Sequence, residues 1–545
     1  MQGDAGVRSV FEAFRASARL YAERPFLREP PDATRQRAPA AAASWTYAAA
    51  AAEVDRLQLR YAAGGPGPGR RVALTAGSTV DVYLHLLALN GLEMSLVPVD
   101  MNGSDAEIAF VLRHSDSMLV VSTREQVGRL RRITRDIAGC RAVTPDELAP
   151  HAAREVQPAA GNTGREAALL YTSGTTGKPK GCMLSNDYFL TMGRWYNSLS
   201  GRYALTSDDR LLTPLPPNHM NALCVSFMAM ITCGGCIVQL DRFHPSSWWD
   251  TVQSEGATII HYLGVMPAIL LSLPAGEYED FGMQVKFGFG AGVDPPHQGR
   301  FERRFGFPLL EAWAMTETGA GAAIIADCEP RHVGQRCIGR PSPETEYRII
   351  DDTERDVAAG ESGELLVRRK GRNFRKGFFS GYYKDEDATR EAWRGGWFHT
   401  GDVVRAGPDG SLFFVDRRKN VIRRSGENIS AVEVEATLLT HPDVANCAVT
   451  AVPDELRGDE VFAFIVPAAD AATDRAAAEG VLEHCLEHLS YFKVPGYVAY
   501  VDELPLTASQ KVSRKELKSA ASACLATTAC FDFRNVKKRR NRKAG

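Results

Sequence analysis

Residues 167–181 read AALLYTSGTTGKPKG, an apolar run that passes directly into a loop of glycines, hydroxyls and lysines. The apolar run has the length and composition of a buried strand. In the loop, glycines let backbone N–H groups approach a ligand, while the hydroxyls and lysines supply donors for phosphate oxygens. The loop differs from a Walker A loop, because Gly174 and Gly177 are too close together and Pro179 follows Lys178. The stretch predicts a strand that ends in a phosphate-binding loop.

On both sides of this loop, short apolar strands alternate with helical stretches. This alternation is typical of parallel sheets joined by crossover helices. The predicted strands include SLVPVD (95–100), SMLVVS (117–122), GCIVQLD (235–241), ATIIHYLG (257–264) and MQVKFGFGAG (283–292). We therefore predict an α/β fold with two parallel α/β sheets in its N-terminal part.

From about residue 333 the pattern changes to short β segments separated by Gly, Asp and Pro turns, which favours a small distorted β-barrel. Farther on, helices and strands alternate again in a smaller α+β unit. We expect a large N-terminal domain over residues 1–416, a small C-terminal α+β domain over residues 417–520, and a disordered basic tail over residues 521–545.

Charge and hydropathy limit the partners of the chain. Its 545 residues carry 64 bases and 66 acids, a net charge of −2, so nucleic acid is not an expected partner. The segment 534–545 holds seven of these bases and no acid, and we interpret it as a solvated end rather than a nucleic-acid, membrane or coenzyme contact. The N-terminus lacks the pattern of a secretory signal, and no apolar run reaches the ~20 residues of a membrane span. We expect a cytoplasmic protein without a membrane span.

The chain has 11 cysteines, an odd number that favours free thiols in a reducing compartment. Cys233 and Cys236 form a C-x-x-C pair between apolar segments. A structural metal site would need a second ligand pair with suitable spacing, and none is nearby. A redox pair is the alternative, but the apolar flanks favour small core residues.

The loop at 171–181 resembles the phosphate loop of the adenylate-forming superfamily, which includes acyl-CoA synthetases, adenylation domains of peptide synthetases and beetle luciferase. Four further motifs of that superfamily follow in order along roughly residues 10–520. They are WAMTE (313–317), TGD (400–402), DRRKNVI with SGENIS (416–430), and LPLTASQKVSR (504–514). Gln510 stands where most relatives have glycine. The resemblance implies a fold of one large domain and one small mobile domain.

The resemblance also implies how ATP and magnesium would be held. Glu317 would hold Mg²⁺ together with Thr175, since hard cations prefer oxygen ligands, and Thr316 would contact the α-phosphate. Trp313 would stack on adenine. The other implied nucleotide-binding residues are Thr172, Ser173, Gly174, Thr175, Thr176, Gly177, Lys178 and Lys180 for the phosphates, Gly290, Ala291 and Gly292 beside the nucleotide, and Asp402 and Arg417 for the ribose.

The resemblance implies roles in the two half-reactions for three residues near the C-terminus. Lys511 would bridge the substrate carboxylate and the α-phosphate with its ammonium group. Lys419 occupies the hinge position about which the C-terminal domain rotates. After rotation, the loop around Gly426 would face the pantetheine tunnel, where glycine permits close approach of the backbone.

The acyl pocket is expected to involve His219, Phe287, Gly288 and Ala314. Relatives usually have glycine at the last position, so its methyl group predicts a shortened pocket. No acidic residue lies in NALCVSFMAMITCGGCIVQL (221–240), which argues against an α-amino acid. The stretches ATIIHYLGVMPAILLSLP and IRRSGENIS are most similar to bacterial carnitine/crotonobetaine-CoA ligases. A quaternary ammonium would favour an aromatic cage, for which Trp195 and Tyr196 are candidates.

These observations predict an ATP-dependent acid–CoA ligase that uses ATP, Mg²⁺ and coenzyme A as a monomer or homodimer. Its substrate would be a small or medium carboxylic acid, activated as acyl-AMP with release of pyrophosphate. The alternative is a stand-alone enzyme that loads the acid onto the pantetheine of a carrier protein. A catalytically dead scaffold and a luciferase-like oxygenase are further hypotheses.

Overall fold

A computed structural model gives the architecture of the chain. It describes residues 6–31, 43–75, 80–101, 103–148, 160–172, 179–274, 280–418, 422–424, 427–454, 458–489, 491–506, 512–527 and 529–536. The chain forms two compact units, each described here by itself. Unit 1 comprises residues 1–293, 297–347 and 367–398, and unit 2 comprises residues 294–296, 348–366 and 399–545.

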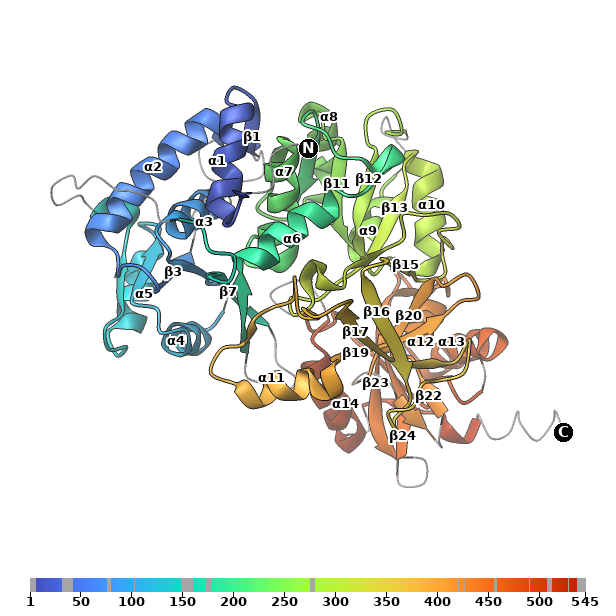
Figure 1. The fold of residues 1–545 in the computed structure, drawn as a ribbon. Coiled ribbons are helices and arrows are strands. Elements are labelled where there is room, and N and C mark those ends of the chain that lie inside the picture. Colours follow the sequence, from blue (N-terminus) through green and yellow to red (C-terminus); the bar gives the residue numbers. More distant parts are fainter. Residues whose placement is uncertain are drawn as a thin grey trace. The chain divides into compact units, whose positions relative to one another are not determined.

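The first sheet of unit 1 contains the strand that precedes the phosphate loop (Figure 1). Its strand order is β6-β5-β3-β4-β7-β8-β18, and pairing is parallel from β6 to β7 and antiparallel beyond. The strands are β3 (Arg71–Thr75), β4 (Ser95–Pro98), β5 (Leu119–Ser122), β6 (Arg141–Val143), β7 (Glu166–Thr172), β8 (Lys180–Ser185) and β18 (Gly381–Tyr382). Helices α4 (Asp105–His114) and α5 (Val127–Thr134) pack on one face through buried aliphatic side chains.

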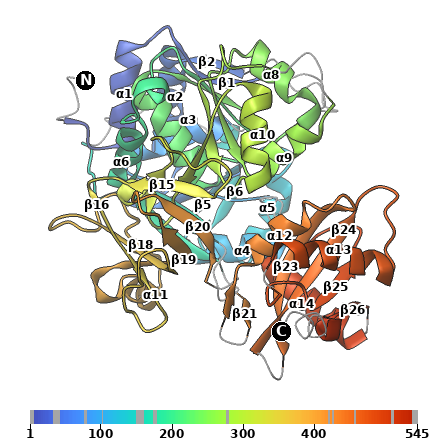
Figure 2. The ribbon, with the colours of Figure 1, turned by 90° about the vertical axis from the view of Figure 1, so that its right-hand side faces the viewer.

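The second sheet of unit 1 has the order β2-β1-β10-β9-β11-β12-β13-β14-β15. Pairing is parallel from β1 to β13, with antiparallel strands at both ends. The strands are β1 (Pro25–Glu29), β2 (Ala43–Thr46), β9 (Arg210–Thr213), β10 (Cys236–Gln239), β11 (Ile259–Leu263), β12 (Phe287–Ala291), β13 (Leu309–Trp313), β14 (Ile324–Ile325) and β15 (Cys337–Pro341). One face is covered by α8 (Trp248–Ser254), α9 (Val265–Ser272) and α10 (Pro295–Phe305), as Figure 2 shows.

The other helices of unit 1 are α1 (Val10–Leu20), α2 (Tyr47–Gly64), α3 (Asp81–Gly91), α6 (Asn186–Tyr196), α7 (Phe227–Cys233) and α11 (Glu386–Ala392). The first turns of α1, α2, α6 and α11 are capped by side-chain oxygens that accept otherwise unpaired N–H groups. Ser9 accepts from Glu12 at the start of α1, and Thr46 accepts from Ala49 at the start of α2. The alanine run at 48–52 lies inside α2, as expected for a strong helix former.

Unit 2 is built around a six-stranded sheet with the path β22-β21-β24-β25-β26, and β23 pairs with β24. Along β24 the side chains alternate, so Val461 and Ala463 enter one buried cluster and Phe462 and Phe464 enter another. The elements are β21 (Ile422–Arg424), β22 (Glu427–Ile429), α12 (Ala431–Leu438), β23 (Val444–Asp454), β24 (Gly458–Pro467), α13 (Arg475–His488), β25 (Tyr497–Tyr500), α14 (Arg514–Thr527) and β26 (Phe531–Asp532).

Four further strands are β16 (Thr345–Ile350), β17 (Ser362–Arg369), β19 (Phe398–Ala406) and β20 (Leu412–Arg417). All four lie in the region from about residue 333 onward, where the sequence predicts short β segments. The predicted fold class is confirmed: the chain is α/β, with a large N-terminal sheet domain and a smaller C-terminal domain.

The prediction of disorder from residue 521 is wrong for the first part of that segment. Helix α14 continues to Thr527, and β26 pairs with β25 in antiparallel register. Phe533 is fully buried in the same cluster as Val498. Burial of apolar surface therefore holds this segment against the sheet although basic residues follow it.

All 11 cysteines are free. Cys233 and Cys236 are both buried, and burial raises the pKa of each thiol, that of Cys236 to about 11. Both thiols are therefore protonated at neutral pH, as expected for core residues. Among the described residues, no helix combines the length and hydropathy that crossing a membrane requires.

Candidate functional site

The predicted site residues fall into one group in each unit. In unit 1, the carboxyl ends of two adjacent parallel strands, β12 and β13, bring several of them together. Gly290 pairs with Glu311 across these strands, so the exposed Ala291 and Gly292 lie beside the segment that carries Trp313. The carboxyl edge of a parallel sheet is where α/β proteins bind ligands.

Glu311 fixes the turn that follows β12. Its carboxylate accepts hydrogen bonds from the N–H of Gly292 at 2.8 Å and from the hydroxyl of Tyr262 at 2.7 Å. Burial raises the pKa of this carboxyl group, although the three hydrogen bonds that it accepts act in the opposite direction. Gly292 has φ +82°, a conformation that favours glycine. Trp313 is 5% exposed and ends β13, whereas Ala314 is exposed.

His219 lies at the same edge, in the loop that follows β9. Its carbonyl accepts the N–H of Leu223 at 3.0 Å, and a π-helical segment over Asn221–Ser226 begins two residues later. Segments of π-helix often occur at functional sites. The side chain of His219 is exposed.

Phe287 and Gly288 lie at the opposite end of β12. Phe287 is fully buried and its ring packs edge-on against Tyr203 at 5.5 Å. A side chain at position 288 would collide with Leu309, so glycine is required there by packing between strands. The structure therefore places these two residues in the sheet and does not bring them to the edge that holds His219 and Ala314.

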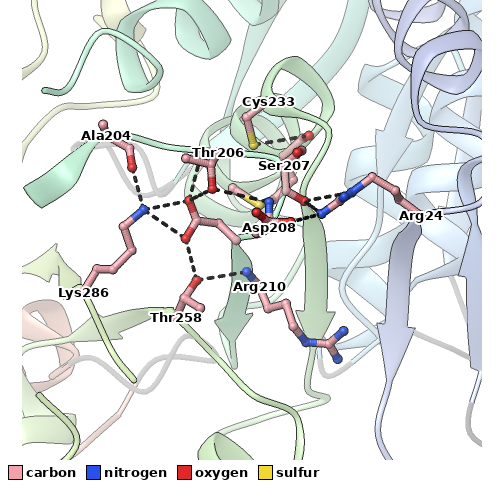
Figure 3. Close-up of polar contacts among 11 residues, drawn as sticks. Arg24, Ala204, Thr206, Ser207, Asp208, Arg210, Cys233, Thr258 and Lys286 are labelled. Carbon is pink, nitrogen blue, oxygen red and sulfur yellow. Dashed lines mark hydrogen bonds and ion pairs between the residues drawn. The ribbon is translucent and has the colours of Figure 1, made fainter. Parts of the chain in front are cut away.

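A polar cluster lies at that opposite edge of the sheet (Figure 3). Asp209 is 3% exposed and accepts hydrogen bonds from Lys286 at 2.8 Å and from Thr258 at 2.8 Å. The Lys286 ammonium also donates to the carbonyl of Ala204 at 2.6 Å. These contacts join the N-terminal ends of β9, β11 and β12. The cluster thus has a structural role and leaves the carboxyl edge for ligands.

The ends of the phosphate loop are fixed in the first sheet. Thr172 ends β7 and Lys180 begins β8, and the two residues are antiparallel partners. The residues between them that were predicted to bind phosphate, Ser173, Gly174, Thr175, Thr176, Gly177 and Lys178, lie outside the described residues.

Thr316 and Glu317 lie in the turn after β13. The hydroxyl of Thr318 accepts the N–H of Met315 at 2.9 Å and closes this turn. Glu317 is 8% exposed, and its Oε1 accepts a hydrogen bond from the hydroxyl of Tyr382 at 3.0 Å. A positioned carboxylate is a suitable ligand for Mg²⁺. Tyr382 belongs to β18, which pairs with β8, so Glu317 is linked to the strand that leaves the phosphate loop.

In unit 2, Asp402 and Arg417 are backbone partners across β19 and β20. Asp402 is 3% exposed, and its Oδ1 lies 3.3 Å from Nε of Arg417. The hydroxyl of Thr400 accepts the N–H of Asp402 at 3.0 Å and donates to the carbonyl of Leu365 at 2.7 Å. Thr400 thus fixes the backbone of Asp402, and Arg417 on the adjacent strand holds the carboxylate that was predicted to bind ribose.

Glu364 organises the turn before Asp402. Its carboxylate accepts the N–H of Gly401 at 3.1 Å and pairs with the guanidinium of Arg418 at 2.7 Å, while Nδ1 of His399 lies 3.6 Å away. Burial favours the neutral form of Glu364, but the contacts with His399, Gly401 and Arg418 outweigh burial and lower the pKa of this carboxyl group. Glu364 is therefore ionised.

The remaining predicted residues of unit 2, Lys419, Gly426 and Lys511, lie outside the described residues. The flanks of Lys511 are held in place: Leu506 and Val512 form an antiparallel bridge, and Arg514 binds Glu435 through two hydrogen bonds of 2.6 and 3.0 Å. The described residues on both sides of positions 507–511 are therefore held in place.

The structure also shows polar residues that the sequence did not single out. His261 on β11 is fully buried between Ser226, at 2.9 Å, and the hydroxyl of Tyr196, at 3.0 Å. Because Tyr196 is fully buried and bonded in this way, it does not fit the predicted aromatic cage. Trp195 packs edge-on against Phe289 at 6.1 Å.

Two sequence profiles match the chain. The profile described as AMP-binding enzyme matches residues 14–383, and the profile described as AMP-binding enzyme C-terminal domain matches residues 433–511. The chain is 32% identical over 487 residues to a sulfoacetate–CoA ligase of Cupriavidus necator, covering 87% of this chain and 92% of that protein. It is 29% identical over 491 residues to a crotonobetaine/carnitine–CoA ligase of Citrobacter koseri, covering 87% and 93%.

Solved structures show the same architecture. The o-succinylbenzoate CoA synthetase of Bacillus subtilis in complex with its acyl-adenylate intermediate is 25% identical, with a TM-score of 0.79, and the match covers 93% of this chain and 97% of that chain. The same enzyme in complex with ATP and magnesium ion matches with a TM-score of 0.78, at 25% identity and over 93% and 99% of the two chains.

Proposed function

Because this chain belongs to the AMP-binding enzyme family and is an acid–thiol ligase, we propose that it converts a small or medium carboxylic acid into its coenzyme A thioester through an acyl-AMP intermediate. Adenylate-forming CoA ligases use ATP, Mg²⁺ and coenzyme A. The observation that carries the proposal is that Tyr382 pairs with β8, the strand that leaves the phosphate loop, and donates a hydrogen bond to Glu317.

In the first step, a carboxylate oxygen attacks the α-phosphorus of ATP, an O–P bond forms, and the bond to pyrophosphate breaks. The residues of the phosphate loop would hold the β- and γ-phosphates, and Thr316 would contact the α-phosphate. When bound, Mg²⁺ neutralises charge on the triphosphate, and Glu317 and Thr175 are the residues that would hold it. Lys511 would bring its ammonium to the reacting oxygens.

The resemblance assigns two sets of residues to the nucleoside. Trp313 would stack on adenine beside Gly290–Gly292. Asp402 would accept both ribose hydroxyls, because a carboxylate offers two acceptor oxygens, and the exposed side chain of Arg417 would add a contact to ribose or phosphate.

In the second step, the thiol sulfur of coenzyme A attacks the acyl carbonyl carbon, and the bond from that carbon to the AMP oxygen breaks. Residues 417–520 would act as a mobile lid that rotates about Lys419 between the two steps. The loop around Gly426 would then approach pantetheine.

We infer a small acid from the acyl side of the site. Ala314 would place a methyl group where a longer chain would pass, and the π-helical segment after His219 carries no charged residue. The named substrates of two relatives, sulfoacetate and crotonobetaine or carnitine, are also small acids.

A panel of small carboxylic acids, assayed for ATP-dependent pyrophosphate release, tests the proposal. Each active acid is then offered free coenzyme A or a phosphopantetheinylated carrier protein in parallel. Thioester formation with free coenzyme A supports the proposal, and exclusive loading of the carrier would replace it with the carrier-loading alternative. Absence of pyrophosphate release with every acid would favour a scaffold without catalytic activity.

The cytoplasm is the compartment that the sequence predicts for this enzyme, and a monomer or a homodimer is its expected state. Fractionation of cells that express the tagged chain tests the first expectation. Light scattering on the purified protein distinguishes the two states.

A further inference from the structure

We propose that Tyr382 is a positioning residue that fixes the Glu317 carboxylate for the divalent cation and thereby sets the affinity of the nucleotide site for that cation. The inference rests on the proposed function, because that function assigns Glu317 to the metal. It adds a residue that none of the recognised motifs contains.

The segment of Tyr382 holds Glu317 at two points. The tyrosine hydroxyl donates to Oε1 of Glu317 at 3.0 Å, and the N–H of Phe379 donates to the Glu317 carbonyl at 2.9 Å. Glu317 is 8% exposed, so little water competes with the side-chain hydrogen bond. One short segment therefore fixes both the backbone and the carboxylate of this residue.

Tyr382 is itself fixed. Its backbone pairs with Cys182 of β8, and its N–H donates to the hydroxyl of Thr389 at 2.9 Å. Its ring packs edge-on against Phe379, with the ring centroids 4.8 Å apart. A tyrosine held at backbone and ring can direct its hydroxyl to only a small region, which here contains Oε1 of Glu317.

The same ring contacts Lys180, the first residue of β8. The ammonium of Lys180 is 4.8 Å from the ring centroid of Tyr382, within the range of a cation–π contact. Lys180 begins β8 and pairs with Thr172 at the other end of the loop. The ring of Tyr382 thus contacts the ammonium of Lys180, and its hydroxyl contacts the carboxylate of Glu317. Tyr382 therefore fixes these two groups relative to each other.

The hydroxyl donates over the whole physiological range of pH. Burial raises the pKa of Tyr382 above its ordinary value, and the nearby charge of Glu317 raises it further. The hydroxyl therefore remains protonated. Hydrogen bonds from the surroundings to a metal-binding side chain orient it, and their loss typically costs about 10- to 100-fold in metal affinity.

Tyr382→Phe isolates this hydrogen bond, because phenylalanine retains the ring that contacts Lys180 and Phe379. Binding of Mn²⁺, a paramagnetic substitute for Mg²⁺, is followed by electron paramagnetic resonance on the full chain with a non-hydrolysable ATP analogue. We expect the dissociation constant for Mn²⁺ to rise about 10- to 100-fold. Binding of the analogue without metal should change less than about twofold.

Tyr383→Phe is the matched control. The hydroxyl of Tyr383 donates to the carboxylate of Asp116 at 2.5 Å, on the exposed side of the same segment. This variant loses one tyrosine hydroxyl in the adjacent position and should bind Mn²⁺ as the unmodified chain does. An equal loss of affinity in both variants would overturn the inference.

A second background tests whether Tyr382 acts through Glu317. Glu317→Asp keeps the charge but withdraws the carboxylate from the hydroxyl, so Tyr382→Phe should then change Mn²⁺ affinity by less than about twofold. If Tyr382→Phe lowered Mn²⁺ affinity as strongly in the Glu317→Asp variant as in the unmodified chain, the inference would be overturned. Unchanged Mn²⁺ binding by Tyr382→Phe alone would also overturn it. In both cases the ligase proposal stands. If the unmodified chain bound neither the ATP analogue nor Mn²⁺, both proposals would fail.

Discussion

Asp402 and Arg417 face each other as backbone partners across β19 and β20, with Oδ1 of the aspartate 3.3 Å from Nε of the arginine. The carboxylate is buried and the guanidinium is exposed. The ion pair therefore holds the acceptor in place while leaving the arginine accessible to a ligand. This arrangement suits the recognition of ribose by Asp402.

Asp402→Asn should weaken the use of ATP. The amide retains the size of the side chain but loses the charge and one acceptor, and hydrogen bonds to charged groups contribute about 10- to 100-fold in affinity. We expect the KM for ATP to rise by that factor in a pyrophosphate-release assay. Asp387→Asn on the exposed surface of α11 is the control and should leave the KM for ATP unchanged; equal effects of both changes would contradict the assignment.

Lys511→Ala should reduce formation of the acyl-adenylate by at least about a hundredfold, since it removes the charge that we propose to stabilise the reacting oxygens. Thioester formation from a preformed acyl-adenylate should be spared. The two half-reactions are measured separately, the first by pyrophosphate–ATP exchange and the second by coenzyme A consumption. Lys515→Ala, an exposed lysine in α14, serves as control. Equal loss of both half-reactions would show that Lys511 has another role.

Lys419→Pro should have the reverse effect. Proline fixes one backbone dihedral angle at the predicted hinge and should prevent rotation of the C-terminal domain. Pyrophosphate–ATP exchange is expected to continue, while formation of the thioester is lost. Full ligase turnover by this variant would contradict the assignment of Lys419 as the hinge.

Stability should fall in acid because of His261. Burial lowers the pKa of His261 from 6.5 to about 3. Between these two values the unfolded chain binds a proton that the folded chain does not, so the free energy of unfolding decreases as pH falls, by about 1.4 kcal/mol per pH unit for one such group. His261→Gln should flatten the dependence of denaturant midpoints on pH between 6.5 and 3. An unchanged slope would contradict the assignment.

The parallel sheets could be predicted from local sequence because their strands are continuous apolar runs between glycine turns. Strand β12 in MQVKFGFGAG was recognisable in this way. The segment beyond residue 520 was not, because the basic residues that follow conceal the few apolar side chains, such as Phe533, that bury it against β25.

The site was predictable where its residues cluster in motifs and not where distant residues meet. Glu317 stands in the motif 313–317, but its partner Tyr382 lies 65 residues away, and Glu364 lies 54 residues from Arg418. The spacing of residues within a motif does not predict such contacts, because these residues come together only when the sheets form. Phe287 belongs to a recognisable strand, but which end of the strand faces the ligand depends on the direction of the whole sheet.

The central claim, that a carboxylate is activated by transfer of AMP, is tested most directly by isotope transfer. The first acid that supports pyrophosphate release is labelled with ¹⁸O in both carboxylate oxygens and converted to product with ATP and coenzyme A. The account predicts one ¹⁸O in each AMP by mass spectrometry, because the attacking oxygen stays on phosphorus when the thioester forms. AMP without label, or label found in pyrophosphate or orthophosphate, would contradict it.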